Sequence, residues 1–566
     1  MAANPDMPLL ANSLVIGVTG HRRLRAQDIA GLEADVRTFL QELQARFPGL
    51  PLVVLSPMAE GADQLVAQVA LDLGLYVVAP LPLPLALYRE DFKDPANLQL
   101  LDRQLAQVEV LELPLERGET PATLALPGPT RDRRYRQAGI FVSSHCHVLL
   151  ALWDGRQTGR VGGTADIVRF HMEGATQADP DNRRAADTLL GPDQENVAYH
   201  VPAARDGNAD VANARPRWLA AGEDAQAGLA LPDAFARMFS RQAAFNADMR
   251  KYAAPIAAQP APSPAAAACP VWRTFVAADW LARIYQRRVA RVLLTTYVLV
   301  ALMGFAFFTY TDVVSNDLVI YAFLLLFATG SVVMTIASRR EWQRKYLDYR
   351  ALAEGLRVQS YWRRAGIVVA GARAFAHDNF MQKQDVELGW IRNVMRGAGI
   401  DGMRVPLAAD GGDVQGVVDE WVGEPGGNGQ LGYYAGSSLY RARLHRRGEM
   451  LGHVCLGLGV GLCVVLAIFA SRFDASTKQV LVSAMGILSV AAAVHEAYMH
   501  KKADKELIRQ YRFMQRIFTS AYRRLAAVAD VVGRQRILGA LGEAALTEHA
   551  EWTLLHRERP LPQSRI

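Results

Sequence analysis

The chain has 566 residues, too many for one ordinary hydrophobic core, so we expect two to four domains. Hydrophobic residues make up 51% of it and the mean hydropathy is slightly positive, which is unusual for a purely soluble protein. Four scattered cysteines argue against a disulfide-stapled secreted domain, and the net charge of +6 is small enough that charge positions matter more than their sum.

The first third of the chain alternates short apolar runs with helical patterns. The opening MAANPDMPLLANS has no basic segment and no sustained apolar run, so we expect no signal peptide. β-rich runs follow at 14–20, 51–57, 76–83, 108–114 and 147–155, and VAYHVPA (197–203) reads as the last strand. Because these runs are apolar on both faces, they predict an α/β doubly wound parallel sheet, that is, a Rossmann-like domain.

Polar residues gather where these strands end. In doubly wound sheets ligands bind beyond the carboxyl ends of the strands, so we expect these residues to share one nucleotide-binding edge. The candidates are Gly17, Thr19, Gly20, His21 and Arg22 from the first strand, Ser56, Glu60, Gly61 and Asp63 from the second, Tyr88 and Asp91 from the third, and Trp153, Asp154, Gly155, Gly162, Gly163, Thr164 and Asp166 from the fifth.

The stretch GRVGGTADIVRF (159–170) is the most specific of these motifs. Gly162 and Gly163 let the backbone approach an anion, Thr164 adds a hydroxyl, and the helix expected to begin there presents unpaired N–H groups. Taken alone, Gly-Gly-Thr is more often just a turn and a helix cap than an anion-binding site. His145, Cys146 and His147 stand together, but no second ligand cluster is evident, so we expect no metal site.

Four long apolar runs predict membrane-spanning helices, at about 292–310, 318–337, 450–470 and 480–497. They form two pairs, each joined by a short polar link, and a buried core helix is the alternative for each run. Arginines and lysines flank the outer ends of both pairs, as at Arg287, Arg340, Arg446 and Lys501. The positive-inside rule therefore predicts a multi-pass protein of the inner (cytoplasmic) membrane, with N-terminus, central segment and C-terminus in the cytoplasm.

The remaining segments connect these parts. Residues 219–274 predict a helix and a mobile Pro/Ala-rich linker, and 397–436 predict a loose Gly-rich connection. Basic, aromatic-bearing helical patterns follow both hairpins, so 275–396 and 437–566 look like a duplicated unit of hairpin and helix.

Several motifs resemble known families. IGVTGHR, SPMAEGADQLVA, YREDF, LLALWDG and GGTADIVRF resemble the SLOG superfamily of Rossmann-like domains, which is related to the Lonely Guy phosphoribohydrolases, DprA and the sensor regions of TRPM channels. YRALAEGLRVQSYW and LGEAALTEHAEWTLLHRERPL resemble the SLATT effectors, two-helix membrane hairpins associated with SLOG domains in bacterial conflict systems. The resemblance covers 12–218 and 275–566.

The SLOG resemblance implies a nucleotide or nucleotide-derived ligand. Lonely Guy enzymes carry a glutamate three residues beyond the threonine of their glycine motif, and that position is Ile167 in this chain. We therefore expect binding without turnover; Glu60 or Asp63 remains a possible general acid or base, and spacing does not single out either.

Together these features predict a membrane-anchored receptor-effector for antiphage defence, in which a nucleotide-sensing head controls pore-forming or membrane-disrupting helices. The alternatives are a membrane-tethered nucleotide-hydrolysing enzyme and a constitutive channel or structural subunit with a degenerate head. The expected partners are the lipid bilayer, a nucleotide-type small molecule and further copies of the chain, without nucleic acid and without a certain cofactor.

Overall fold

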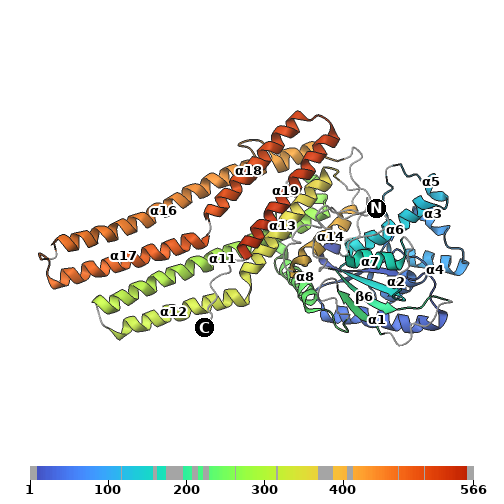
Figure 1. Ribbon diagram of the computed structural model, residues 1–566, viewed down its shortest axis with the longest axis horizontal. Coiled ribbons are helices and arrows are strands. Elements are labelled where there is room, and N and C mark those ends of the chain that lie inside the picture. The colour runs from blue at the N-terminus through green and yellow to red at the C-terminus, as the bar shows by residue number, and fades with distance from the viewer. Residues whose placement is uncertain are drawn as a thin grey trace. The chain divides into compact units, whose positions relative to one another are not determined.

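The chain forms two compact units, shown in Figure 1. The head unit comprises Met1–Ala277 and Ala351–Gly412, and the membrane unit comprises Ala278–Arg350 and Asp413–Ile566. The computed structural model describes residues 9–557 except 117, 157–161, 174–195, 207–214, 221–227, 262, 314–315, 368–385, 405–411, 470 and 503. The predicted lead-in to the Gly-Gly-Thr turn (159–161) and most of the polar stretch before the sixth strand lie outside the described residues.

A seven-stranded sheet forms the centre of the head unit, in the order β4-β3-β2-β1-β5-β6-β7. Its strands are β1 Leu14–Gly20, β2 Leu52–Leu55, β3 Tyr76–Leu81, β4 Glu109–Glu112, β5 Val148–Trp153, β6 Val197–Pro202 and β7 Arg217–Ala220. The first six are parallel, which confirms the predicted Rossmann-like sheet. β7 runs antiparallel to β6, so the expectation that 197–203 is the last strand is wrong; four residues give too short a pattern to recognise.

Helices cover both faces of this sheet, with α1 and α2 on one face and α6 and α7 on the other (Figure 1). Gly17 allows α6 to lie close to β1, because a Cβ there would come within 2.7 Å of the Cβ of Cys146. The helices of the sheet domain are α1 Ile29–Arg46, α2 Ala62–Asp72, α3 Leu85–Arg89, α4 Pro95–Leu105, α5 Pro121–Ala125, α6 Pro129–His145 and α7 Thr164–Glu173, with 3-10 turns η1 Leu10–Asn12 and η2 Ala26–Asp28.

Two helices from the expected connecting segments complete the head unit. α8 (Asp233–Lys251) is joined to the start of β1 by Gln242, whose side-chain amide donates to the carbonyl of Ser13 at 3.0 Å. α14 (Gly389–Met403) packs so closely on η1 that a Cβ at Gly397 would lie 2.4 Å from the carbonyl of Leu10. The first part of the predicted loose connection is thus a buried helix. Shorter elements are α9 Ala253–Ala257, α10 Pro264–Ala268 and η6 Val386–Leu388.

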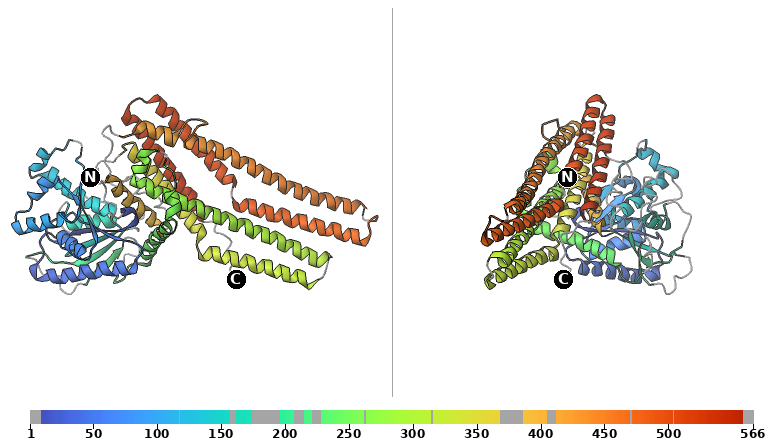
Figure 2. Two further views of the ribbon diagram at one scale, coloured as in Figure 1. Left: turned by 180° about the vertical axis from the view of Figure 1, so that it is seen from behind. Right: turned by 60° about the vertical axis from the view of Figure 1, so that its left-hand side comes forward.

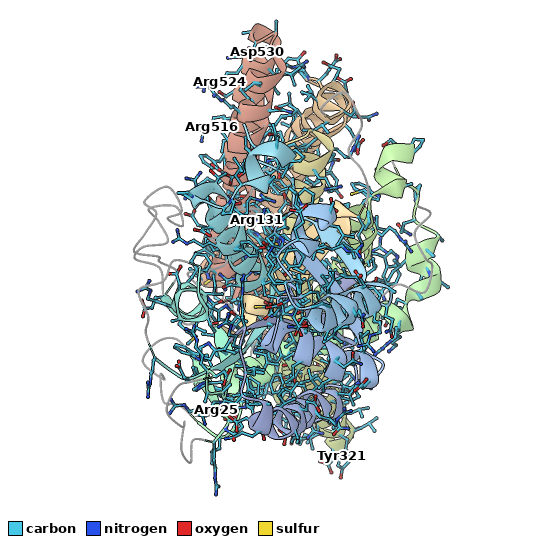
Figure 3. All side chains as sticks on the ribbon, turned by 90° about the vertical axis from the view of Figure 1, so that its right-hand side faces the viewer. Arg25, Arg131, Tyr321, Arg516, Arg524 and Asp530 are labelled. Carbon is cyan, nitrogen blue, oxygen red and sulfur yellow. The ribbon has the colours of Figure 1, made fainter. Side chains whose placement is uncertain are left out.

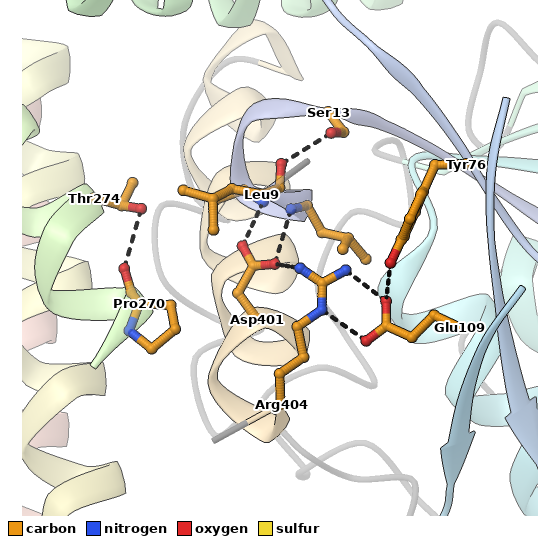
Figure 4. A network of polar contacts seen from close by, with 10 residues as sticks. Leu9, Ser13, Tyr76, Glu109, Pro270, Thr274, Asp401 and Arg404 are labelled. Carbon is orange, nitrogen blue, oxygen red and sulfur yellow. Dashed lines mark hydrogen bonds and ion pairs between the residues drawn. The ribbon is translucent and has the colours of Figure 1, made fainter. Parts of the chain in front are cut away.

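A polar network fixes α14 at the amino-terminal edge of the sheet (Figure 4). Asp401 accepts hydrogen bonds from the backbone N–H groups of Leu10 and Ala11 at 2.9 and 3.0 Å. Arg404 joins Asp401 to Glu109 with two contacts to the Glu109 carboxylate at 2.8 and 2.7 Å. The hydroxyl of Tyr76 donates to the same carboxylate at 2.9 Å.

The membrane unit contains the four predicted spans within long helices, seen as two antiparallel pairs in Figures 1 and 2. By length and composition, four helices of the described chain could span a membrane, and almost none of their apolar windows is buried. The helices of this unit, two of which begin or end in the head unit, are α11 Pro270–Phe308, α12 Asp317–Arg339, α13 Trp342–Arg364, α15 Val414–Val417, α16 Gln430–Phe469, α17 Ala475–Lys502, α18 Asp504–Ala527 and α19 Val531–Arg557, with π-helical turns η5 Thr309–Val313 and η7 Val418–Val422.

The two hairpins contact each other through α11 and α17. A Cβ at Gly304 would lie 2.6 Å from Val490, and one at Gly486 would lie 2.4 Å from the ring of Phe308. Small residues allow such close approach between helices that gain little from the hydrophobic effect in lipid. The spans therefore form one bundle rather than two separate hairpins.

Candidate functional site

The candidate site lies at the carboxyl edge of the sheet. We use the word rim for the residues at the ends of β1, β2, β3 and β5 together with the first turn of α7. β1 and β5 are neighbours, with Gly20 opposite Leu152, so their outgoing loops lie side by side. Most of the predicted site residues are on this rim, which is the edge opposite the α14 network.

The Gly-Gly-Thr turn leads directly into α7, as predicted. Gly162 has φ +74°, a conformation that favours glycine, and its N–H donates to the carboxylate of Asp166 at 2.9 Å. The hydroxyl of Thr164 donates to the carbonyl of Gly20 at 2.8 Å. Asp166 and Thr164 thus hold the turn and the β1 loop in place, and the proton of the Thr164 hydroxyl already has an acceptor within the protein.

Arg136 on α6 lies beneath this turn and was not found by sequence reasoning. Its side chain is only 4% exposed, and its Nε stands 3.4 Å from the Asp166 carboxylate. Its Nη2 is buried without a hydrogen-bond partner among the described residues. A buried guanidinium N–H without an acceptor is costly, and a phosphate oxygen is a suitable acceptor.

His21 has a structural role at the end of β1. Its ring is 3% exposed, with Nε2 3.3 Å from the Asp154 carboxylate and Nδ1 accepting from Arg205 Nε at 3.2 Å. The backbone N–H of Asp154 donates to Nε2 at 3.1 Å, so both ring nitrogens accept hydrogen bonds from neighbouring N–H groups. Burial, followed by the positive charge of Arg205, lowers the pKa of His21, while Asp154 opposes that shift. Both ring nitrogens are occupied, so His21 positions the rim instead of meeting a ligand.

The first turn of α2, which follows the loop after β2, carries a carboxyl group with a strongly raised pKa. Asp63 is 7% exposed, and burial raises its pKa to about 7 even though the Ala59 N–H and Arg22 oppose the shift. Met58, a non-glycine residue, has φ +62° in this loop, a strained conformation of the kind that gathers at functional sites. A buried carboxyl group with a strongly raised pKa is a candidate for a functional residue.

Aromatic and charged side chains close the rim beside β3. Asp91 pairs with Arg131 at 2.8 Å and also contacts the hydroxyl of Tyr135. The guanidinium of Arg22 lies 5.0 Å from the centre of the Tyr135 ring. Tyr88 is buried, with its hydroxyl donating to the carbonyl of Pro57 at 2.9 Å. Arg131 and Tyr135 come from α6, whose RDRRYRQ segment precedes β5 and carries no recognisable site pattern.

The other predicted residues have mainly structural places. Trp153 belongs to the hydrophobic core of the sheet, and Gly61, at φ +85°, allows the β2 loop to approach the carbonyl of Arg22. Glu60 accepts a hydrogen bond from Asn97 at 3.4 Å. Thr19 and Ser56 are buried, and Gly155 turns the chain after β5 at φ +75°.

Ile167, which stands where Lonely Guy enzymes carry a glutamate, is 2% exposed and packs in the core. Its δ carbon would lie 2.5 Å from a Cβ at Gly139. Across the described residues, no group of three or more His, Cys, Asp and Glu side chains is arranged to hold a metal ion.

Comparison with known proteins yields a partial structural similarity. No family model and no curated protein matches the chain. Among solved structures, the chain is similar to DNA processing protein A (DprA) from Streptococcus pneumoniae, with 19% sequence identity over 29% of this chain and a TM-score of 0.20. The match spans 48% of that protein.

Proposed function

We propose that the head unit binds a nucleotide or nucleotide-derived signal at the rim and that binding controls the membrane helices. The unpaired, buried Nη2 of Arg136 beneath the Gly162–Thr164 turn is the observation that carries this proposal. A phosphate at the start of α7 gains the positive end of the helix dipole and the Arg136 guanidinium together. Arg22 adds a second positive charge on the same rim.

The chain itself supplies a route from head to membrane. α11 begins in the head unit at Pro270 and continues to Phe308, and α13 begins in the membrane unit at Trp342 and ends in the head unit at Arg364. These two crossings are helical, whereas the Pro/Ala-rich linker lies within the head unit. We infer that ligand binding changes how the membrane helices associate and thereby opens or disrupts the bilayer.

The first test is the melting temperature of the full chain in lipid nanodiscs with a panel of nucleotides. The full chain is needed because α14 belongs to the head unit and a fragment ending near residue 250 lacks it. A ligand that binds only the folded state stabilises it by about 2.7 kcal/mol at one hundred times Kd, so the correct nucleotide raises the melting temperature.

Two matched variants locate the binding site. Gly163→Glu places a negative side chain in the turn and should abolish the shift. Gly31→Glu makes the same change on α1, where nothing lies within 4 Å of an added Cβ, and should retain it. A shift that survives Gly163→Glu places the ligand elsewhere and contradicts the proposal.

The proposed effect of ligand binding on the membrane needs a separate test. Liposomes that contain the protein and a trapped dye should leak only when the nucleotide found by melting is present. Leakage without any nucleotide favours a constitutive channel, and no leakage with a bound nucleotide contradicts membrane disruption.

A second candidate function is hydrolysis of the bound nucleotide, and the raised pKa of Asp63 favours it. A carboxyl group that titrates near pH 7 serves as a general acid or base. Chromatography after incubation with the nucleotide that shifts the melting temperature detects any product. Product from wild type but not from Asp63→Asn, with binding retained, supports the enzyme; binding without product supports the sensor.

A further inference from the structure

The membrane unit carries a basic groove outside its apolar spans, between α16 and α18. The groove has a volume of about 1530 Å³ and is lined by Arg446 from α16 and by Arg509, Arg512, Arg516, Arg523 and Arg524 from α18. At one end Lys505 pairs with Glu449 at 2.9 Å. None of the six arginines has a carboxylate partner within the described chain, so the groove has a strong positive charge that the protein does not neutralise.

Packing does not require this charge. Arg509, Arg512, Arg516 and Arg523 follow one another at three-, four- and seven-residue steps, which places them along one face of α18. The buried face of the same helix carries Met514 and Phe518 instead. Figure 3 shows the side chains of Arg516 and Arg524 extending from the same side of the helix. Like charges at these spacings destabilise an isolated helix, so a ligand is the simplest reason for them.

Lipid headgroups account for only one end of the groove. Positive charge next to a span is expected at the cytoplasmic surface, where the polar layer of a bilayer leaflet is about 5–8 Å thick. Lys505 to Arg523 extends about 27 Å along α18 at 1.5 Å per residue. Because α16 is one continuous helix from Gln430 to Phe469, the groove along its first half leads away from the apolar spans.

The lining selects for phosphate groups rather than bases. It contains six arginine guanidinium groups and the hydroxyl of Ser520, and the only ring among the lining residues is the imidazole of His445, with no Phe, Tyr or Trp. Arginine binds phosphate through two parallel hydrogen bonds, whereas single-stranded nucleic acid sites add aromatic rings for base stacking. We propose that this groove binds a linear, water-soluble polyphosphate anion. The proposal is independent of the nucleotide proposed for the rim, because its residues lie in the membrane unit.

Binding of fluorescent inorganic polyphosphate to the full chain in phosphatidylcholine nanodiscs tests the proposal. Binding should weaken as salt is raised, because it releases counterions. The double variant Arg512→Gln, Arg516→Gln should weaken binding about tenfold through the loss of two charge-assisted contacts. These side chains are exposed, so the variant should keep the wild-type melting temperature.

The control variant, Arg443→Gln with Arg447→Gln, removes the same charge from exposed positions on α16 outside the groove lining. It should bind polyphosphate as wild type does. An equal loss of binding in both double variants would mean that only the net charge of the protein matters, and this would overturn the proposal. Absence of binding also overturns it. Tighter binding of a single-stranded oligonucleotide with as many phosphates would assign the groove to nucleic acid, and displacement of polyphosphate by anionic-lipid nanodiscs would assign it to headgroups.

Discussion

The two edges of the head-unit sheet carry polar clusters that differ in one respect. At the amino-terminal edge, Asp401 and Glu109 have their partners in Arg404, Tyr76 and two backbone N–H groups (Figure 4). At the carboxyl edge, the Nη2 of Arg136 has no hydrogen-bond partner among the residues that the structure describes. Buried polar groups are normally satisfied, so the first cluster is complete, and the unpaired donor of Arg136 is where we propose that a ligand binds.

The largest expected effect comes from breaking the satisfied edge. Arg404→Ala leaves Asp401, 1% exposed, and Glu109, 14% exposed, without their common cation. Removing one partner of a buried ion pair costs about 3–5 kcal/mol, so the variant should lower the melting temperature of the head unit strongly. Nucleotide binding by whatever protein remains folded should be retained, since the rim lies at the other edge.

A surface pair in the same unit provides the control for that variant. Arg89 and Asp102 contact each other at 2.7 Å with side chains 48% and 40% exposed. Arg89→Ala should therefore change stability by less than about 1 kcal/mol. Comparable losses of stability in the two variants would show that the hydrogen-bonded network at the α14 edge contributes no more than a surface ion pair does.

The second effect concerns pH, and it arises from Asp63 on the rim. The folded pKa of about 7 lies above the unfolded value near 3.8, so the folded state binds more protons between these values. The contribution of Asp63 to stability is fully present below about pH 4 and is lost as pH rises through 7. Asp63→Asn should stabilise the head unit at pH 8 by on the order of 4 kcal/mol and have little effect at pH 4.

Melting temperatures of both proteins from pH 4 to pH 8 give this comparison directly. Burial also raises the pKa of Asp401 to about 6, which gives both proteins a similar but smaller dependence of melting temperature on pH. Because both proteins contain Asp401, this contribution cancels in their difference. A pH-independent difference between wild type and Asp63→Asn would mean that Asp63 has an ordinary pKa and no special role on the rim.

Local sequence patterns predicted the sheet. They did not predict contacts between residues that are far apart in the sequence. Apolar runs bounded by glycine identified six strands, and the Gly-Gly-Thr turn identified the start of α7, because these signals lie within a few residues. Arg136 was missed because its place beneath Gly162 depends on how α6 packs on β1. The glycines from Gly397 onward predict a loose connection, but the structure places Gly397 in a buried helix. This glycine is needed for close contact with Leu10, and that contact cannot be recognised locally because Leu10 is distant in the chain.

The variant with the smallest expected effect on stability, Arg136→Gln, tests most directly whether the rim binds a nucleotide. Arg136→Gln removes the ion pair with Asp166, but Asp166 keeps its contacts with Arg169 and the Gly162 N–H at 3.0 and 2.9 Å. The variant also removes an unpaired buried donor, so the two effects oppose each other and stability should change by about 1 kcal/mol or less. The melting shift produced by the nucleotide should nevertheless disappear. A large loss of stability with the shift intact would mean that Arg136 supports the fold, as Arg404 does, and that both edges of the sheet are structural.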